Sequence, residues 1–294
     1  MKILLLGKNG QVGWELQRSL APLGNLVALG RHDAGGDLSQ PQAVAERIMQ
    51  ERPQVIVNAA AYTAVDKAEN DTALCRTINT TAVQAMAQAA ASVGALLVHY
   101  STDYVFNGAG QKPWLETDPT GPLNFYGQTK LEGEQAIAAS GCQHLTLRTS
   151  WVYGSRGGNF VKTMLRLAQE REQLQVINDQ HGAPTGADLI ADVSAHAIRA
   201  TLADPALVGL YHLVAAGETT WYGYARYCLK QARAAGVAIK VPADQVLAVP
   251  TSAFPTPAQR PHNSRLSTTK LQQQFGLQLP HWQQGVQRLL QTVL

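Results

Sequence analysis

The chain has 294 residues, of which 45% are hydrophobic and 15% charged, a balance that supports a sizeable core and excludes wholesale disorder. Its 24 Lys and Arg against 21 Asp and Glu leave a formal net charge of +3, which is too small to indicate a nucleic-acid binder. Apolar runs such as Val55–Ala61 are far below the roughly 20 residues that span a bilayer, so no membrane segment is predicted. Because its three cysteines form no C-x-x-C pair, we expect a protein of the reducing cytoplasm.

Through the first half of the chain, short aliphatic runs alternate with longer amphipathic stretches. Each run has the length of a strand, whereas apolar residues within Thr72–Val93 recur at helical spacing. Strands separated by helices indicate a parallel sheet that is covered on both faces, a Rossmann-like, doubly wound α/β fold. The predicted strands are Ile3–Leu6, Leu26–Leu29, Val55–Val57, Leu96–Val98 and Leu145–Leu147, and the predicted helices are Gln11–Leu20, Gln42–Glu51, Thr72–Val93 and Tyr126–Ala139.

The second half of the chain is less regular. Prolines gather between Pro242 and Pro261, which predicts a covering loop rather than a packed element. We expect residues 1–150 to form the first domain and residues 151–294 to form mainly a smaller α/β substrate domain. The two are expected to be interleaved, because a segment near residues 175–205 returns to the first. The helices expected here are Val161–Glu172, Ala187–Leu202, Trp221–Ala235 and Trp282–Leu294, with strands at Val176–Ile177 and Leu210–Val214.

A glycine-rich segment follows the first predicted strand and opens the first predicted helix. Gly7, Gly10 and Gly13 have the spacing G-x-x-G-x-x-G, which permits a tight turn and lets the backbone approach a pyrophosphate. The helix N-terminus adds unpaired N–H groups, and Gln11 and Val12 are expected to contribute them. An ordinary glycine-rich turn is the alternative, but the strand before and the helix after favour a dinucleotide site. We therefore expect the first domain to bind a nicotinamide cofactor.

The end of the second predicted strand bears on the choice of cofactor. NAD enzymes commonly place an acid there to bind the ribose 2′-hydroxyl, whereas here Arg31 follows Gly30. An arginine can pair with the 2′-phosphate of NADPH, although a solvated surface arginine is the alternative. We predict NADPH in preference to NADH, and NADH stays open. Other residues expected near the cofactor are Asp37, Leu38, Ala59, Ala60, Ala61, Tyr62 and Thr63.

A tyrosine and a lysine four residues apart provide the candidate catalytic pair. On a helix, Tyr126 and Lys130 would share one face, and a neighbouring ammonium would lower the pKa of the phenol. A chance pair on a solvated helix is the alternative. Against it, Thr102 lies just after the fourth predicted strand, at the sheet edge where open α/β folds bind ligands. The three residues therefore indicate proton transfer beside a bound cofactor.

Several segments resemble the extended short-chain dehydrogenase/reductase family. The glycine and Tyr-x-x-x-Lys motifs are shared across that superfamily. The runs Asn-Ala-Ala-Ala-Tyr-Thr-Ala-Val-Asp, Gln-His-Gly-Ala-Pro-Thr and Arg-Pro-x-x-Ser narrow the resemblance to nucleotide-sugar reductases. The segments that carry it are Gly7–Gly13, Val57–Glu69, Ser101–Phe106, Tyr126–Lys130, Arg148–Tyr153, Asp179–Thr185 and Arg260–Leu266.

The resemblance implies a reaction and a set of roles. It implies NADPH-dependent reduction of the C4 keto group of a dTDP-sugar, dTDP-4-dehydro-L-rhamnose, to dTDP-L-rhamnose for cell-surface polysaccharide. Tyr126 would donate the proton, Lys130 would bind the nicotinamide ribose and tune Tyr126, and Thr102 would stabilise the developing alkoxide. Asp103 would help to hold the sugar and Trp151 would contact it, although an aromatic residue packed in the core is the alternative for Trp151.

The pyrophosphate of such a substrate needs cationic or N–H donors. Arg260 in the proline-rich stretch is the candidate, with Arg265 behind it, and a loop arginine in water is the alternative. The family resemblance also allows for Mg2+ associated with subunit assembly and for a homodimer. Glu15 and Asp188 are the candidate ligands, but the interpretation that we favour for each is an ordinary surface carboxylate. The sequence itself shows no clustered metal ligands.

Two other functions stay open at this point. Epimerases and dehydratases share the glycine loop and the Tyr–Lys pair, but dehydratases usually place Asp-Glu after the threonine of the fourth strand. Here Asp103 is followed by Tyr104, which favours simple reduction. The regulatory β subunit of methionine adenosyltransferase has a reductase-like fold and acts by binding a partner. Intact Thr102, Tyr126 and Lys130 favour an enzyme over that role.

Overall fold

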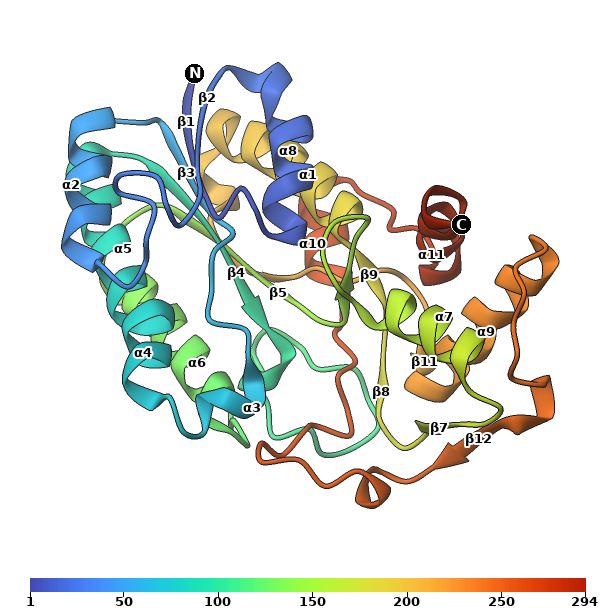
Figure 1. Ribbon diagram of the computed structural model, residues 1–294. Helices are drawn as coiled ribbons and strands as arrows, with labels where there is room; N and C mark the ends of the chain where they lie inside the picture. The colour runs from blue at the N-terminus through green and yellow to red at the C-terminus, as the bar shows by residue number, and fades with distance from the viewer.

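A six-stranded parallel sheet forms the centre of the computed structural model, which describes residues 1–294 (Figure 1). Its order is β10-β5-β4-β3-β1-β2, so the direction of winding reverses between β1 and β3. Aliphatic residues make these strands nearly continuous apolar runs, as expected for a sheet buried on both faces. The strands are β1 (Lys2–Leu6), β2 (Asn25–Leu29), β3 (Val55–Asn58), β4 (Leu96–Thr102), β5 (His144–Thr149) and β10 (Gly209–His212).

Helices cover both faces of this sheet. Because side chains alternate along a strand, Ile3 and Leu5 enter the core on one face, while Leu4 and Leu6 enter the core on the other. Helices α1 (Gln11–Leu20), α8 (Ala187–Ala203) and α10 (Thr269–Phe275) pack on the first face, and α2 (Pro41–Glu51), α5 (Ala82–Val93) and α6 (Phe125–Ala139) on the second. The predicted doubly wound α/β fold is confirmed.

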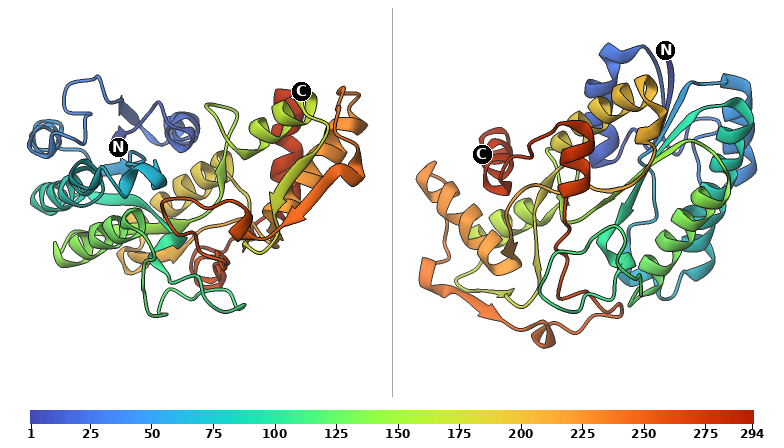
Figure 2. Two further views of the ribbon diagram at one scale, coloured as in Figure 1. Left: turned by 60° about the horizontal axis from the view of Figure 1, so that its bottom comes forward. Right: turned by 180° about the vertical axis from the view of Figure 1, so that it is seen from behind.

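A second unit with its own core lies beside the sheet. The core comprises 19 buried residues and is built mainly by α7 (Phe160–Glu170), α9 (Trp221–Ala234) and α11 (Trp282–Val293). In both views of Figure 2 its orange segments lie at one side of the molecule, and the cyan and green helices lie at the other. The short elements around it are β6 (Val152–Tyr153), β7 (Leu174–Ile177), β8 (His181–Gly182), β9 (Thr185–Gly186), β11 (Thr219–Thr220) and β12 (Val246–Val249).

The proline-rich stretch is more ordered than predicted. Instead of a loop throughout, it contains β12, which pairs in parallel with β7. The four apolar residues of β12 are too short a run to stand out among the prolines around them. Helix α10 was also not predicted, because only Leu271 and Phe275 mark its buried side.

The predicted helix Thr72–Val93 is interrupted. It consists of α4 (Thr72–Arg76), a π-helical turn at Thr77–Thr81 and α5. Within the turn, the Asn79 side chain exchanges hydrogen bonds with the backbone of Tyr62, from Tyr62 N at 2.9 Å and to Tyr62 O at 3.1 Å. A side chain that bonds a neighbouring segment inside a helix accounts for the widened turn. The short helix α3 (Val65–Ala68) precedes it.

We propose to keep the division into two interleaved domains at about residue 150, with one refinement. Helix α8 and strand β10 lie in the second half of the chain but pack with the sheet in the first core. Strand β7, by contrast, belongs to the core of the second unit. No helix of the structure has the length and hydropathy needed to cross a membrane.

Candidate active site

A cleft of about 730 Å³ opens at the carboxyl end of the sheet, where the winding reverses. Open α/β sheets bind ligands at such a switch point. The cleft brings together every residue expected near the cofactor except Gly13. The predicted residues that line it are Gly7, Gly10, Gln11, Val12, Arg31, Asp37, Leu38, Ala59, Ala60, Ala61, Tyr62, Thr63, Tyr126 and Lys130.

The glycine loop forms the floor of this cleft. Gly7 has φ +87°, and a Cβ there would lie 2.7 Å from the carbonyl carbon of Ala59. Gly13 faces inward, where a Cβ would collide with the Gly7 carbonyl, so its role is close packing of α1. A Cβ on Gly10 would meet nothing closer than 3.5 Å, and no side chain caps the start of α1. The loop therefore fits a pyrophosphate, since it leaves room and a helix N-terminus for one.

The sequence predicted no acidic residue at the end of β2, but the structure places two there, Asp33 and Asp37. The Arg31 guanidinium is exposed, and its Nε lies 3.5 Å from a carboxylate oxygen of Asp37. Asp33 accepts a hydrogen bond from Gly30 N at 2.7 Å and pairs with Lys8. The loop that follows β2 carries both acids back to the strand end, which the linear spacing did not reveal. Arg31 lines the cleft as predicted, but its charge is partly balanced.

Helix α6 places Tyr126 and Lys130 on the wall of the cleft. Asn124 caps the helix by accepting a hydrogen bond from Gly127 N at 2.8 Å, and its amide donates to Gln259 O at 2.7 Å. Gly127 has no room for a side chain, because a Cβ there would collide with the carbonyl oxygen of Tyr104. The first turn of α6 is therefore held against the segment that follows Thr102.

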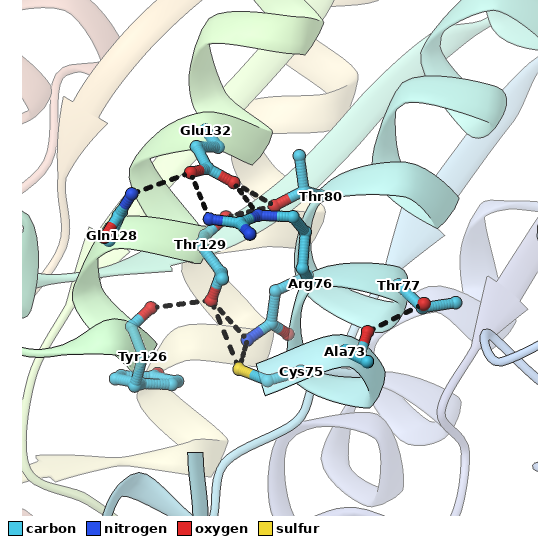
Figure 3. A network of polar contacts seen from close by, with 10 residues as sticks. Ala73, Cys75, Arg76, Thr77, Thr80, Tyr126, Gln128, Thr129 and Glu132 are labelled. Carbon is cyan, nitrogen blue, oxygen red and sulfur yellow. Dashed lines mark hydrogen bonds and ion pairs between the residues drawn. The ribbon is translucent and has the colours of Figure 1, made fainter. Parts of the chain in front are cut away.

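Polar contacts hold α6 from behind as well, as Figure 3 shows. The Thr129 hydroxyl donates to the Tyr126 carbonyl at 2.9 Å and lies 3.3 Å from the Cys75 sulfur. The Arg76 guanidinium makes a bidentate pair with Glu132: its Nε and Nη2 each donate to a different carboxylate oxygen at 3.0 Å. These contacts join α6 to α4 and fix the position of Tyr126.

The expected lowering of the pKa of Tyr126 is wrong for the cofactor-free chain. Burial raises the pKa of Tyr126, and a hydrogen bond with Thr102 only partly opposes this. The Lys130 ammonium does not contribute, because its Nζ is bonded to Tyr100 O at 2.7 Å and lies 3.1 Å from His99 Nε2. Burial lowers the pKa of Lys130 itself to about 8.

Buried polar atoms without partners gather at the ends of β4 and β5. They are Ser101 Oγ, Asp103 Oδ2, Thr149 Oγ1 and Ser150 Oγ. Ser101 and Thr149 line the cleft, so polar groups of a ligand could satisfy them. Burial raises the pKa of Asp103 to about 6, against hydrogen bonds from Ser264 and Thr102 that lower it. Such unsatisfied groups are typical of a binding site rather than of a core.

A second hollow of about 260 Å³ lies between the two units. Trp151 lies on its wall with a left-handed backbone conformation, φ +48°. Its ring stacks on the ring of Trp221, with the ring centroids 3.7 Å apart. Trp151 therefore lies between β5 and β6, outside both strands, and it packs against the second core from the wall of the hollow. Tyr104 also lines this hollow and packs edge-on against Tyr126, with ring centroids 5.6 Å apart. The hollow thus adjoins the candidate catalytic tyrosine.

The two candidate arginines differ in position. Arg260 lines the second hollow, where its guanidinium pairs with both carboxylate oxygens of Asp66 at 3.0 and 2.8 Å. Arg265 pairs instead with Glu218 and does not line the hollow. Sequence reasoning missed Trp221, Tyr104 and the Asp66 partner. Tyr104 directly follows Thr102-Asp103, so its position in that motif was the available signal.

Glu15 and Asp188 do not form a magnesium site within the single chain. Glu15 and Asp188 do line one shallow hollow of about 160 Å³. However, Glu15 pairs with Arg18 at 3.4 Å, and Arg288 lies 3.7 Å from Asp188. No group of three or more potential ligands occurs in the chain, and the oxygen-rich shell that Mg2+ prefers is missing. The allowance for Mg2+ finds no support.

The fold and the cleft define a class of protein. A tyrosine and a lysine one helical turn apart, facing a dinucleotide-shaped cleft at the switch point of a parallel sheet, are characteristic of short-chain dehydrogenases/reductases. The second unit that follows β5, with its own hollow, is typical of the extended members of that class, which include reductases, epimerases and dehydratases.

Comparison with known proteins gives the family. The sequence model of the RmlD substrate binding domain matches residues 1–294. The dTDP-4-dehydrorhamnose reductase of Escherichia coli (strain K12) is 61% identical over 292 residues, which cover 99% of this chain and 97% of that protein. The chain therefore belongs to the dTDP-4-dehydrorhamnose reductase family.

Solved structures agree with this assignment. The reductase of Clostridium acetobutylicum matches with a TM-score of 0.91 at 35% identity, covering 100% of this chain and 99% of that one. The reductase of Bacillus anthracis, in complex with NADP, matches with a TM-score of 0.88 at 34% identity and covers 99% of both chains.

Proposed function

We propose that this protein uses NADPH to reduce the C4 keto group of dTDP-4-dehydro-L-rhamnose, giving dTDP-L-rhamnose. The observation that carries the proposal is the placement of Tyr126, which lines the cofactor-shaped cleft and packs on Tyr104 of the adjoining hollow. A ligand in each cavity would meet at this tyrosine. The names of the relatives and the NADP complex of one similar structure support the substrate and the cofactor.

The residues of the cleft would hold the cofactor. The glycine loop and the start of α1 would receive its pyrophosphate, and Arg31 would pair with a 2′-phosphate. Asp37 beside Arg31 could instead accept a hydrogen bond from a ribose hydroxyl, which keeps NADH in the proposal as a second cofactor. When bound, the cofactor supplies the hydride to the C4 carbon.

Tyr126 would donate the proton to the oxygen at C4. Its raised pKa keeps the phenol protonated at neutral pH, which is the form that a reductase needs from its acid. The Thr102 hydroxyl, close to Tyr126, would donate to the same oxygen as negative charge develops on it. Donors fixed in advance around that oxygen stabilise the transition state more than the ketone.

The second hollow would hold the rest of the substrate. Trp151 on the wall of the hollow would contact the sugar, as would the buried Asp103 next to Thr102, and Arg260 would face the pyrophosphate of the nucleotide. The Asp66 carboxylate fixes the Arg260 side chain in place, since two hydrogen bonds join them. The apolar wall formed by Phe160, Met164 and Trp221 would suit the flat face of a base.

We further propose that the reaction takes place in the cytoplasm and supplies rhamnose for cell-surface polysaccharide. Three buried, unpaired cysteines support a reducing compartment. A homodimer is included in the proposal on the resemblance alone.

The experiment that tests the function follows NADPH oxidation by absorbance with dTDP-4-dehydro-L-rhamnose and a panel of other nucleotide keto-sugars. We expect rapid oxidation with the dTDP-rhamnose precursor and little with the others. A protein that binds NADPH but oxidises it with none of these sugars would contradict the proposal and indicate a non-catalytic, partner-binding role.

A further inference from the structure

The segment Asp179–Thr185, which carries part of the family resemblance, has no role in the proposed function. Its residues lie around Trp151 on the wall of the second hollow. Trp151 and Arg52 are the only residues other than glycine with a positive φ, at +48° and +43°. Arg52 ends helix α2, where a left-handed residue is common, but no helix ends at Trp151. A bulky residue keeps such a costly conformation only where its surroundings enforce it, typically at a functional site.

Gly182 lies against one face of the Trp151 ring. A Cβ on Gly182 would lie 2.8, 3.0 and 3.1 Å from the indole atoms Cε2, Cζ2 and Cδ2, so a side chain there would displace the ring. The φ of Gly182 is not positive, so glycine is needed here for space and not for the backbone. Three residues later, Thr185 N donates a hydrogen bond to Trp151 O at 3.2 Å and holds the backbone of the strained residue.

The ring of Trp221 covers the opposite face, and Gln180 sets the orientation of that ring. The planes of the two stacked indoles are 17° from parallel, with the ring centroids 3.7 Å apart. Trp221 Nε1 donates to Gln180 Oε1 at 3.0 Å. Because an indole N–H can only donate, the Gln180 amide has a single orientation. Gln180 is only 3% exposed, so water does not compete for this hydrogen bond.

The hydrogen bonds continue from Gln180 in one direction, into the proline-rich stretch and back to the same segment. Gln180 Nε2 donates to Thr251 Oγ1 at 3.1 Å, and Thr251 Oγ1 donates in turn to an Asp179 carboxylate oxygen at 2.6 Å. Thr251 N donates to the two oxygens of that carboxylate at 3.0 and 2.9 Å. An ionised acceptor at the end strengthens such a chain of hydrogen bonds. The indole of Trp221 is therefore anchored, through Gln180 and Thr251, to a charged group that does not line the hollow.

We propose that Gln180 and Gly182 are positioning residues that hold the Trp151 ring in place before the substrate arrives. Gly182 leaves space on one face of the ring, and Gln180 fixes Trp221 on the other, so contacts on both faces maintain the left-handed backbone at Trp151. The consequence for the reaction rests on the proposed function: the ring is preorganised as the wall against which the sugar binds. Trp151 does not line the cofactor cleft, so cofactor binding should not depend on this arrangement.

The first test is the geometry of the two indoles in the cofactor-free protein. Stacked indoles couple electronically and give a pair of circular-dichroism bands of opposite sign, a couplet. We expect this couplet in the wild type, and its loss in both Trp151→Phe and Trp221→Phe identifies its source. A wild-type spectrum without such a couplet overturns the proposal, because the two rings are then not held together in the free protein.

The second test removes one support at a time. Gln180→Met keeps the length of the side chain but removes the acceptor for the Trp221 N–H, and Gly182→Ala places a methyl group against the Trp151 ring. We expect each variant to lose most of the couplet. The KM for the dTDP-sugar should rise by about tenfold, since the sugar loses a fixed aromatic wall, while the KM for NADPH stays unchanged. Circular dichroism and initial rates measure the two effects.

The matched controls are Gly158→Ala and Gln173→Met, which should keep the couplet and both KM values. A Cβ on Gly158 meets nothing within 4 Å, and Gln173 bonds to Gln245 away from the hollow. A folded Gln180→Met or Gly182→Ala protein that keeps the wild-type couplet overturns the proposal, as does an equal rise in both KM values. The spectra need neither cofactor nor substrate. A failed reductase assay therefore contradicts the proposed function alone, and an unchanged couplet contradicts this inference alone.

Discussion

At the scale of single residues, the site depends on groups whose surroundings set their protonation. Tyr126 is kept as a phenol by burial, and the nearby Asp103 retains a carboxylate oxygen that the protein itself does not satisfy. Tyr126→Phe and Asp103→Asn each remove one chemical group while nearly keeping the shape of the side chain. Each variant therefore tests one role of one residue.

Tyr126→Phe removes the proposed proton donor without changing the wall of the cleft. We expect kcat to fall by roughly 10²–10⁴-fold, the usual value of a positioned acid. The Kd for NADPH, measured by fluorescence, should stay the same. Wild-type turnover in Tyr126→Phe would show that the proton comes from elsewhere.

Arg31→Ala tests the choice of cofactor. The loss of a charged hydrogen bond to a 2′-phosphate should raise the KM for NADPH by about tenfold. The KM for NADH should change little, since NADH lacks that phosphate. Equal effects on the two cofactors, measured by initial rates, would contradict the role of Arg31.

Asp103→Asn tests the buried carboxylate by stability. Burial raises the pKa of Asp103 from 3.8 to about 6, so the folded chain binds this proton more tightly than the unfolded chain does. The carboxylate therefore lowers the stability of the wild type increasingly as pH rises from about 4 to above 6. An amide has no such cost, so Asp103→Asn should be the more stable protein at pH 7.5 by up to about 3 kcal/mol.

The difference should fall to about 0.5 kcal/mol near pH 4, where the folded carboxyl is protonated and only the unfolded one is partly ionised. Urea unfolding of the two proteins at both values of pH measures it. A difference that is the same at both values would mean that Asp103 is not destabilised as a carboxylate.

At the scale of elements, the first turn of α6 is the part that the catalytic geometry needs most. Gly127→Ala would place a methyl group against the Tyr104 carbonyl and push the turn away from the strand end that bears Thr102. We expect a loss of about 1–3 kcal/mol in unfolding free energy, as for other overpacked sites, together with lower kcat.

Gly158→Ala is the matched control, since a Cβ at Gly158 meets nothing within 4 Å. It should retain both stability and activity. Chemical denaturation and the NADPH assay provide the two measurements. A Gly127→Ala protein as stable and active as the control would show that the contact of α6 with Tyr104 is not needed.

The elements also show where prediction from sequence succeeds. Strands β1, β3 and β4 were predicted because their apolar runs are buried on both faces and need no partner to be recognised. Strand β12 was not predicted, because its pairing with β7 depends on residues about 70 positions away. The π-helical turn was hidden for the same reason, because the widening comes from the contact of Asn79 with Tyr62.

At the scale of the whole molecule, Arg260 links the C-terminal stretch to the first half of the chain through Asp66. If Arg260 receives the substrate pyrophosphate, Arg260→Gln should raise the KM for the dTDP-sugar by about tenfold or more and leave that for NADPH unchanged. Arg265→Gln is the control, because that side chain pairs with Glu218 away from the hollow. If the two variants change the KM for the dTDP-sugar equally, Arg260 does not bind the substrate pyrophosphate.

The site as a whole was only partly visible in the sequence. The cofactor residues could be predicted because they lie in short motifs at the ends of strands, as Gly7 and Ala59 do. The wall formed by Trp151 and Trp221 could not, because the left-handed backbone at Trp151 and its stacking on another element are tertiary properties. The ion pair of Arg31 with Asp37 depends on a loop that folds back, which spacing alone does not reveal.

The packing of one face of the sheet has a consequence for synthesis on the ribosome. Its core includes Ile3 and Leu5, but also Leu271, Phe275 and Leu279, so it is completed by residues near the end of the 294-residue chain. At cellular rates of elongation, the nascent strands wait on the order of tens of seconds for these last partners. The apolar face stays open to chaperones for that time, because the core cannot close before Leu279 has left the ribosome.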